Sequence, residues 1–201
     1  MDAVAPDVSA EFRLPAHVRA CRTGAWFIFL DLKADRYWAL PATTPAREIE
    51  QNLKGADCAE AGRARARPGS SRLMHLLTAS PDALAVLEAA CWAGQIVKKG
   101  RLYCAFEWLE ANKGRRSLSF DDVRRAHDRF EKIRAWVPVR YVCLFNSLAL
   151  MRYLTWRNVG AELVFGVRAM PFAAHCWVEA SGEILDPGEE DCSSFVEIAR
   201  V

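Results

Sequence analysis

The sequence predicts an α+β fold in which a small unit of strands and then helices is followed by a larger unit of helices packed on an antiparallel sheet. Between residues 16 and 41, apolar and aromatic runs alternate with turn residues, as in a strand meander. Helical spacing of apolar residues follows, and it returns in the second half before the period falls to two from Ala161 onward. Strands and helices are thus segregated along the chain, which is typical of α+β proteins.

Composition limits the classes of function that need to be considered. The chain has 201 residues, of which 52% are hydrophobic and 26% charged, and this balance is typical of a folded globular protein. A net charge of +2 gives no general reason to expect nucleic acid as a partner. No segment approaches the roughly 20 apolar residues that span a bilayer, and residues 1–7 lack the pattern of a secretory signal. Seven cysteines, an odd number, favour reduced thiols, so we expect a cytoplasmic protein without a membrane partner.

The first unit begins with three predicted strands and continues with helices. The strands are expected at 17–22, 26–31 and 37–41, with turns at 23–24 and 34–35.

After Pro41, a Thr-Pro pair at Thr44 predicts a capped helix that ends near Gly55. The stretch 61–72 is basic and turn-rich and reads as an exposed loop rather than a phosphate site. A short helix at 73–78 and a longer one from Ser80 through Val97 complete the unit. We therefore expect two domains, 1–99 and 100–201.

The second unit contains two predicted helices and a predicted sheet. Ser119 is expected to cap a helix that Pro138 stops, and a second, apolar helix is expected to begin at Cys143. Alternation from Ala161 predicts one strand, and two further short strands are predicted to meet at a turn at 181–182.

A thiol, an imidazole and a carboxylate follow one another in this unit at Cys143, His175 and Asp186. A cysteine at the first turn of a helix lies near the positive end of the helix dipole, which favours the nucleophilic thiolate. If residues 181–182 form a two-residue turn, Ala180 faces Glu183, Val178 faces Leu185 and Trp177 faces Asp186. His175 then lies diagonal to Asp186, within side-chain reach.

The same alternation places Cys176 on the opposite face of the strand from His175. Adjacent residues on opposite faces do not readily bind one zinc ion, so we expect neither a metal nor a cofactor. Each residue also has a structural interpretation, since a cysteine in an apolar helix is usually core and Asp-Pro-Gly at 186–188 is an ordinary turn. The other five cysteines, at positions 21, 58, 91, 104 and 192, are interpreted as structural only.

The three residues together predict nucleophilic catalysis on a carbonyl. Cys143 would attack, His175 would accept its proton and return it to the leaving amine, and Asp186 would hold the imidazole tautomer. The backbone N–H of Cys143 is the first candidate donor for the oxyanion, with Arg140 and Tyr141 as candidates for a second.

The sequence resembles the processing proteases, or B proteins, of lasso-peptide biosynthesis. The resemblance rests on Cys-Leu-x-x-Ser-Leu-Ala-Leu from Cys143, on Gly166-Val167, on Phe-x-Ala-His-x-Trp-Val-Glu from Phe172, and on Asp186. It implies a transglutaminase-like, papain-related peptidase domain with a Cys-His-Asp triad on Cys143, His175 and Asp186. It also implies that the first half is a small winged-helix-like leader-recognition domain, related to the leader-binding protein of pyrroloquinoline quinone biosynthesis.

The function implied by this resemblance is removal of a leader peptide from a ribosomally made precursor. The leader would add as a strand to the first domain, with help from the helix beginning at Ser80. The peptide-binding residues would be Arg36, Tyr37, Trp38, Ala39 and Leu40. The freed core would pass to an ATP-dependent lasso cyclase, which is the second expected partner beside the precursor peptide.

Two alternatives remain open. The same triad could transfer an acyl group to an amine rather than to water, as in a transglutaminase-type acyltransferase. The chain could also be a non-catalytic peptide-binding scaffold in which Cys143 is structural.

Overall fold

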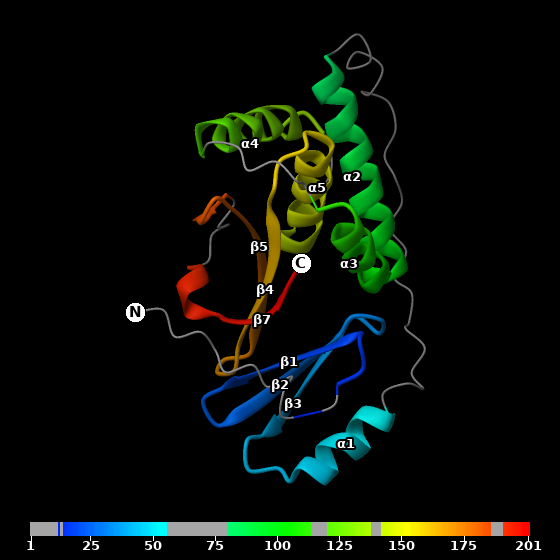
Figure 1. Cartoon of the computed structure of the whole chain (residues 1–201), viewed down its shortest axis with the longest axis vertical. Coiled ribbons are helices and arrows are strands. Elements are labelled where there is room, and N and C mark those ends of the chain that lie inside the picture. Colours follow the sequence, from blue (N-terminus) through cyan, green and yellow to red (C-terminus); the bar gives the residue numbers. More distant parts are fainter. Residues whose placement is uncertain (1–11, 13, 56–79, 114–119, 138–141, 186–190) are drawn as a thin grey trace.

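The structure is a computed structural model that describes residues 12, 14–55, 80–113, 120–137, 142–185 and 191–201. Its first sheet is an antiparallel meander in the order β1-β2-β3, at the bottom of Figure 1. The strands are β1 (Val18–Thr23), β2 (Trp26–Asp31) and β3 (Arg36–Pro41). The predicted meander is confirmed, and its first turn has Gly24 at φ 58°, a left-handed conformation in which glycine has no Cβ clash.

The two faces of this sheet bury different clusters. Phe27 and Phe29 of β2 pack outward with Ile49 of α1 (Ala46–Gly55), whereas Ile28 and Leu30 point inward to the main core. The alternation follows from the period of two along a strand. The helix predicted after Pro41 is confirmed. The predicted loop 61–72 and helix 73–78 lie outside the described residues, and the winged-helix arrangement that depends on them stays a prediction.

Among the described residues, four helices follow α1 along the chain and contribute to the main core. Their bounds are α2 (Pro81–Lys99), α3 (Leu102–Ala111), α4 (Phe120–Arg134) and α5 (Cys143–Trp156). Figure 1 shows α2 lying along α5, which is enclosed between α2 and the second sheet. α5 buries apolar residues around nearly its whole circumference, so it is a central helix, as its sequence predicted.

A buried carboxylate joins three of these helices. Asp82 lies near the start of α2 and is 6% exposed. It accepts a hydrogen bond from Arg129 of α4 at 2.8 Å. It also accepts one from Tyr153 of α5 at 3.1 Å and one from Arg157, which follows α5, at 3.2 Å. A buried charge is tolerated when it is paired and hydrogen-bonded in this way.

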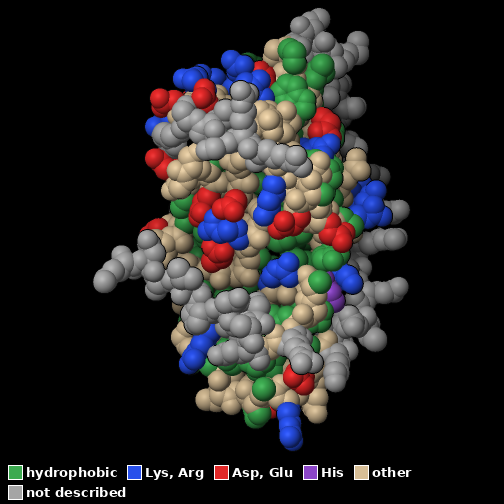
Figure 2. Space-filling view, in the orientation of Figure 1, with side chains coloured by type: hydrophobic (Ala, Val, Ile, Leu, Met, Phe, Trp, Pro, Cys, Tyr) green, Lys and Arg blue, Asp and Glu red, His purple; other side chains and the backbone are tan. Residues whose placement is uncertain are grey.

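Over α4, at the upper left of Figure 2, acidic and basic side chains are intermingled rather than of one sign.

The second sheet is antiparallel in the order β6-β5-β4-β7. Its strands are β4 (Glu162–Arg168), β5 (Ala173–Ala180), β6 (Glu183–Ile184) and β7 (Val196–Arg200). The predicted turn between β5 and β6 is confirmed, since Ser181 and Gly182 have φ of 53° and 81° and Ala180 pairs with Glu183. Two positive φ values match the type I′ turn of tight hairpins. α3 and β7 were not predicted.

The main core runs from the inner face of the first sheet to the helices and the second sheet without interruption. β1 also contacts β7, so the two sheets meet, as Figure 1 shows. α2 packs mainly on α5, α4 and α3, so most of its contacts lie in the second half of the chain. The division at residues 99 and 100 stays a prediction. Among the described residues, no helix has both the length and the apolarity to cross a membrane.

Candidate active site

Cys143 is the first residue of α5. The preceding Val142 is extended, with φ −106° and ψ 159°, and provides no side-chain cap. The Cys143 side chain is solvent-exposed although most of α5 is buried, and its sulfur accepts a hydrogen bond from the backbone N–H of Leu144. A free N–H of the first helical turn and the helix dipole both stabilise a negative sulfur.

His175 of β5 lies beside this sulfur and is 8% exposed. The pKa of Cys143 is lowered to about 5. The largest cause is a hydrogen bond from the side chain of Cys176. The hydrogen bond and positive charge of His175 and the Leu144 N–H act in the same direction, while burial opposes them. Cys143 is therefore a thiolate at neutral pH, the form that attacks carbonyls.

Cys176 points to the opposite face of β5 from His175, as predicted, and belongs to the main core beneath α5. Its carbonyl accepts a hydrogen bond from the Ser147 hydroxyl at 3.2 Å, one turn along α5 from Cys143. This bond fixes the start of α5 against β5, so that both His175 and Cys176 reach the same sulfur. The contact between the two cysteines was not predicted, because strand alternation says nothing about where a helix end lies.

The His175 ring rests on two aromatic side chains. It stacks on Trp177 with centroids 5.9 Å apart and an interplanar angle of 23°, and it packs on Phe195 at 5.6 Å. Gly166, opposite His175 in the register, makes room for them. A Cβ at that position would lie 2.6 Å from Trp177 Cζ3 and 2.8 Å from Phe195 Cβ. Glycine is thus required by a close approach rather than by its backbone angles.

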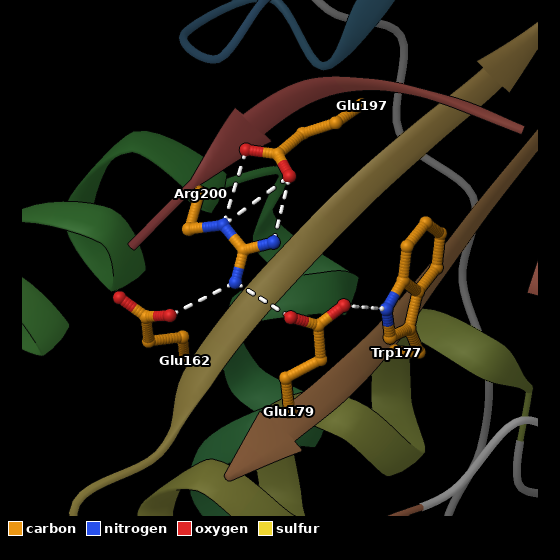
Figure 3. A network of polar contacts seen from close by, with 5 residues as sticks. All are labelled: Glu162, Trp177, Glu179, Glu197 and Arg200. Carbon is orange, nitrogen blue, oxygen red and sulfur yellow. Dashed lines mark hydrogen bonds and ion pairs between the residues drawn. The ribbon is translucent and has the colours of Figure 1, made fainter. Parts of the chain in front are cut away.

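Trp177 is itself held by a polar network that crosses three strands (Figure 3). Its indole N–H donates to Glu179 at 2.7 Å, and Arg200 of β7 donates to the other oxygen of Glu179 at 2.7 Å. Arg200 also donates to Glu162 of β4 at 2.8 Å and to Glu197 at 2.7 Å. The ring beneath His175 is therefore anchored to β4, β5 and β7 together.

The predicted third member of the triad, Asp186, lies outside the described residues, as do Arg140 and Tyr141. The ladder that was predicted to lead to Asp186 is present as far as it is described. Glu179 pairs with Ile184, and the Leu185 N–H donates to the Val178 carbonyl at 2.9 Å. The role of Asp186 stays a prediction.

The predicted peptide-binding segment forms β3, which within the described residues pairs on one side only, with β2. Its Tyr37 reaches the candidate active site. The pKa of Tyr37 is raised, first by burial and then by the electrostatic effect of Cys176, Asp35 and Cys143. Tyr37 packs against the main core that includes Cys176, so an edge strand of the first sheet lies against the elements that hold the candidate site, a proximity that the sequence did not reveal. No group of three or more potential metal ligands occurs in the part of the chain that the structure describes.

The sequence also matches the model of a known protein family. The model of the transglutaminase-like superfamily matches residues 92–200, more than half of the chain, and the chain belongs to that superfamily.

Among curated proteins, the chain is similar to the microcin J25-processing protein McjB of Escherichia coli, with 50% identity over 44 residues. That match covers 22% of this chain and 21% of the relative, so it spans about a fifth of each. No solved structure matches.

Proposed function

We propose that this protein is a cysteine peptidase that removes the leader from a ribosomally made lasso-peptide precursor. The observation that carries the proposal is the position of Cys143, exposed at a helix start beside a buried His175, with a pKa lowered to about 5. Membership of the transglutaminase-like superfamily supports the thiol chemistry. The similarity to a protein named for microcin J25 processing supports a peptide precursor as substrate.

The reaction would proceed through a thioester. The Cys143 thiolate attacks the carbonyl carbon at the junction of leader and core, and the carbonyl electron pair moves to oxygen. The intermediate collapses as the C–N bond breaks and His175 gives a proton to the leaving amine of the core. Water, deprotonated by His175, then attacks the thioester, which releases the leader as a carboxylic acid and restores the thiolate. Asp186 would hold the His175 tautomer during these steps.

Leader binding would take place along β3, at Arg36, Tyr37, Trp38, Ala39 and Leu40. An edge strand binds an extended peptide through main-chain hydrogen bonds, and a tethered substrate reaches an effective concentration of about millimolar at the site. A site of low intrinsic selectivity would then act on one precursor. The freed amine of the core would pass to an ATP-dependent lasso cyclase.

The test is mass spectrometry of the precursor encoded beside this gene, incubated with the protein in H2(18)O. A peptidase gives a single cut and one 18O atom in the new leader carboxylate, and Cys143→Ala abolishes both. Cys104→Ala, which removes another exposed cysteine, is the matched control and should cut at the wild-type rate. Transfer of the leader acyl group to an added amine, in place of 18O, would indicate the acyltransferase instead. Cutting that survives Cys143→Ala would refute the proposal.

A further inference from the structure

An apolar pocket of about 260 Å³ lies between the inner face of the first sheet and the loop that joins β4 to β5. The strands β2 and β3 contribute Ile28, Tyr37 and Ala39, and the loop contributes Ala169, Met170 and Phe172. None of the residues that line the pocket is charged. Its volume is below the roughly 300–1,000 Å³ of sites for drug-sized ligands, and it fits one large side chain.

The rim of the pocket exposes apolar surface to solvent. Met170 is 75% exposed and Phe172 is 54% exposed, although both are large and apolar. The Phe172 ring packs edge-on against Tyr37, with centroids 5.9 Å apart. Neighbouring exposed apolar side chains beside a hollow are typical of a surface that a partner covers.

The pocket adjoins the candidate active site from two directions. Phe172 stands three residues before His175, directly before β5, so the two Cα atoms lie at most about 11 Å apart. Tyr37 lines the pocket and also packs against the main core, to which Cys176 beside His175 belongs. The pocket also borders β3, the strand assigned to leader binding. A peptide bound at the β3 edge would therefore have this hollow beside it.

We propose that the pocket binds one large apolar side chain, aromatic or of the leucine and isoleucine class, carried by the precursor between its β3-bound strand and the scissile bond. This inference rests on the proposed function. Main-chain bonding to β3 gives affinity but little choice of sequence, and a pocket for an alternate side chain supplies that choice. The pocket contains residues of both halves of the chain, so it aligns the docked leader with the thiol.

The test is a double-mutant cycle between protein and peptide. Each large apolar residue of the leader encoded beside this gene is replaced by alanine, and kcat/KM is measured with wild-type protein and with Phe172→Ala. We expect one leader position to lose about 10–100-fold with wild-type protein, as for a well-filled hydrophobic pocket. That loss should shrink to about twofold with Phe172→Ala, because the pocket contact is already gone. Leu84→Ala, an apolar residue of α2 that is 47% exposed, is the control and should behave as wild type.

A binding measurement makes the pocket testable without cleavage. Fluorescence anisotropy of the labelled precursor with Cys143→Ala should show that adding Phe172→Ala weakens binding about tenfold and adding Leu84→Ala does not. Two results would overturn the pocket assignment. One is equal affinity with and without Phe172→Ala; the other is a double-mutant cycle in which the losses from Phe172→Ala and from the leader substitution are additive at every leader position. Absence of cleavage by wild-type protein, with the Phe172 effect on binding retained, would instead refute the peptidase and leave the pocket standing. Alkylation of Cys143 by iodoacetamide in the Phe172→Ala and Leu84→Ala single variants, which retain the cysteine, verifies that the site is folded.

Discussion

At the scale of single residues, the reactivity of Cys143 depends on its neighbours as well as on the helix dipole. The cysteine that lowers its pKa most, Cys176, is buried in the core and was predicted only to point away from His175. The proximity of Cys143 and His175 could be predicted from the sequence because each stands at a recognisable place, a helix start and a strand start. The contact of Cys176 with Cys143 and the packing of Tyr37 could not, because they depend on how distant elements pack.

The pH dependence of alkylation tests this environment. Because the pKa of Cys143 is lowered to about 5, the thiolate fraction rises as the pH passes 5 and is nearly complete at neutral pH. Alkylation of Cys143 by iodoacetamide, followed by peptide mapping, should therefore level off by about pH 6–7. An ordinary thiol, with a pKa of about 8.5, would still be gaining rate at pH 8.

Cys176→Ala should move the alkylation midpoint of Cys143 upward, toward that of an ordinary thiol, because it removes the largest stabilising hydrogen bond. Cys176→Ser retains a donor and should stay closer to wild type. A midpoint that does not move in Cys176→Ala would show that the two side chains do not interact.

Glu179 is expected to act on catalysis through Trp177. Glu179→Ala frees the indole N–H and so loosens the ring on which His175 rests, which should lower kcat about tenfold with KM within about twofold. Glu179→Gln retains a carbonyl oxygen for the indole and should recover most of the rate. Glu162→Ala is the matched control, since it removes a partner of Arg200 without touching Trp177. Equal losses in Glu162→Ala and Glu179→Ala would reduce the network to a purely structural role.

At the scale of elements, the packing of β4 and β5 depends on the absence of a side chain at Gly166. Gly166→Ala places a Cβ 2.6 Å from Trp177 and 2.8 Å from Phe195, and it should destabilise the protein by about 1–3 kcal/mol in urea denaturation. Trp177→Phe removes the nearest atoms, so the double variant should lose less than the sum of the two single changes.

Gly94→Ala in α2 provides the comparison. Its Cβ would have its nearest contact at 3.4 Å, with Phe145, and alanine favours a helix by up to about 1 kcal/mol relative to glycine. Stability close to or above that of wild type is expected there. Similar losses at both glycines would contradict the close-approach argument.

The edge strand β3 should separate binding from reactivity. Ala39→Pro removes a main-chain donor and should weaken binding of the labelled leader about tenfold, while iodoacetamide still alkylates Cys143. Ala39→Ser, which retains the N–H, is the control. Unchanged affinity in Ala39→Pro would remove β3 from the leader site.

The elements that were predicted and those that were missed differ in how locally they are determined. The meander, α5 and the hairpin at 181–182 have turn residues and periodic patterns of their own. α3 has neither a side-chain cap nor an acid in its first turn, and it is apolar along most of its length. β7 is five residues long and depends on pairing with β4, where the register shifts at Phe165 and Gly166. Such elements are stabilised by tertiary contacts that a local pattern does not contain.

At the scale of the whole molecule, one continuous core connects the sheet that contains β3 with the helix that begins at Cys143. The inner face of the first sheet shares that core with α5 and the second sheet, so the proposed leader binding and the proposed catalysis would be mechanically joined. The pocket lies between β3 of the first sheet and the β4–β5 loop of the second sheet, where these two sheets adjoin. Selectivity is then expected to depend on docking more than on the residues at the cut, so that a core peptide without its leader should be a poor substrate.

Covalent catalysis at Cys143 can be tested by intact-protein mass spectrometry after acid quench, during the first turnovers with the precursor. We expect a transient species heavier than the enzyme by the leader minus one water, with the modification mapped to Cys143 and absent from Cys143→Ala. Precursor that is cut while the enzyme never carries this mass, or that is cut equally by Cys143→Ala, would contradict covalent catalysis at Cys143.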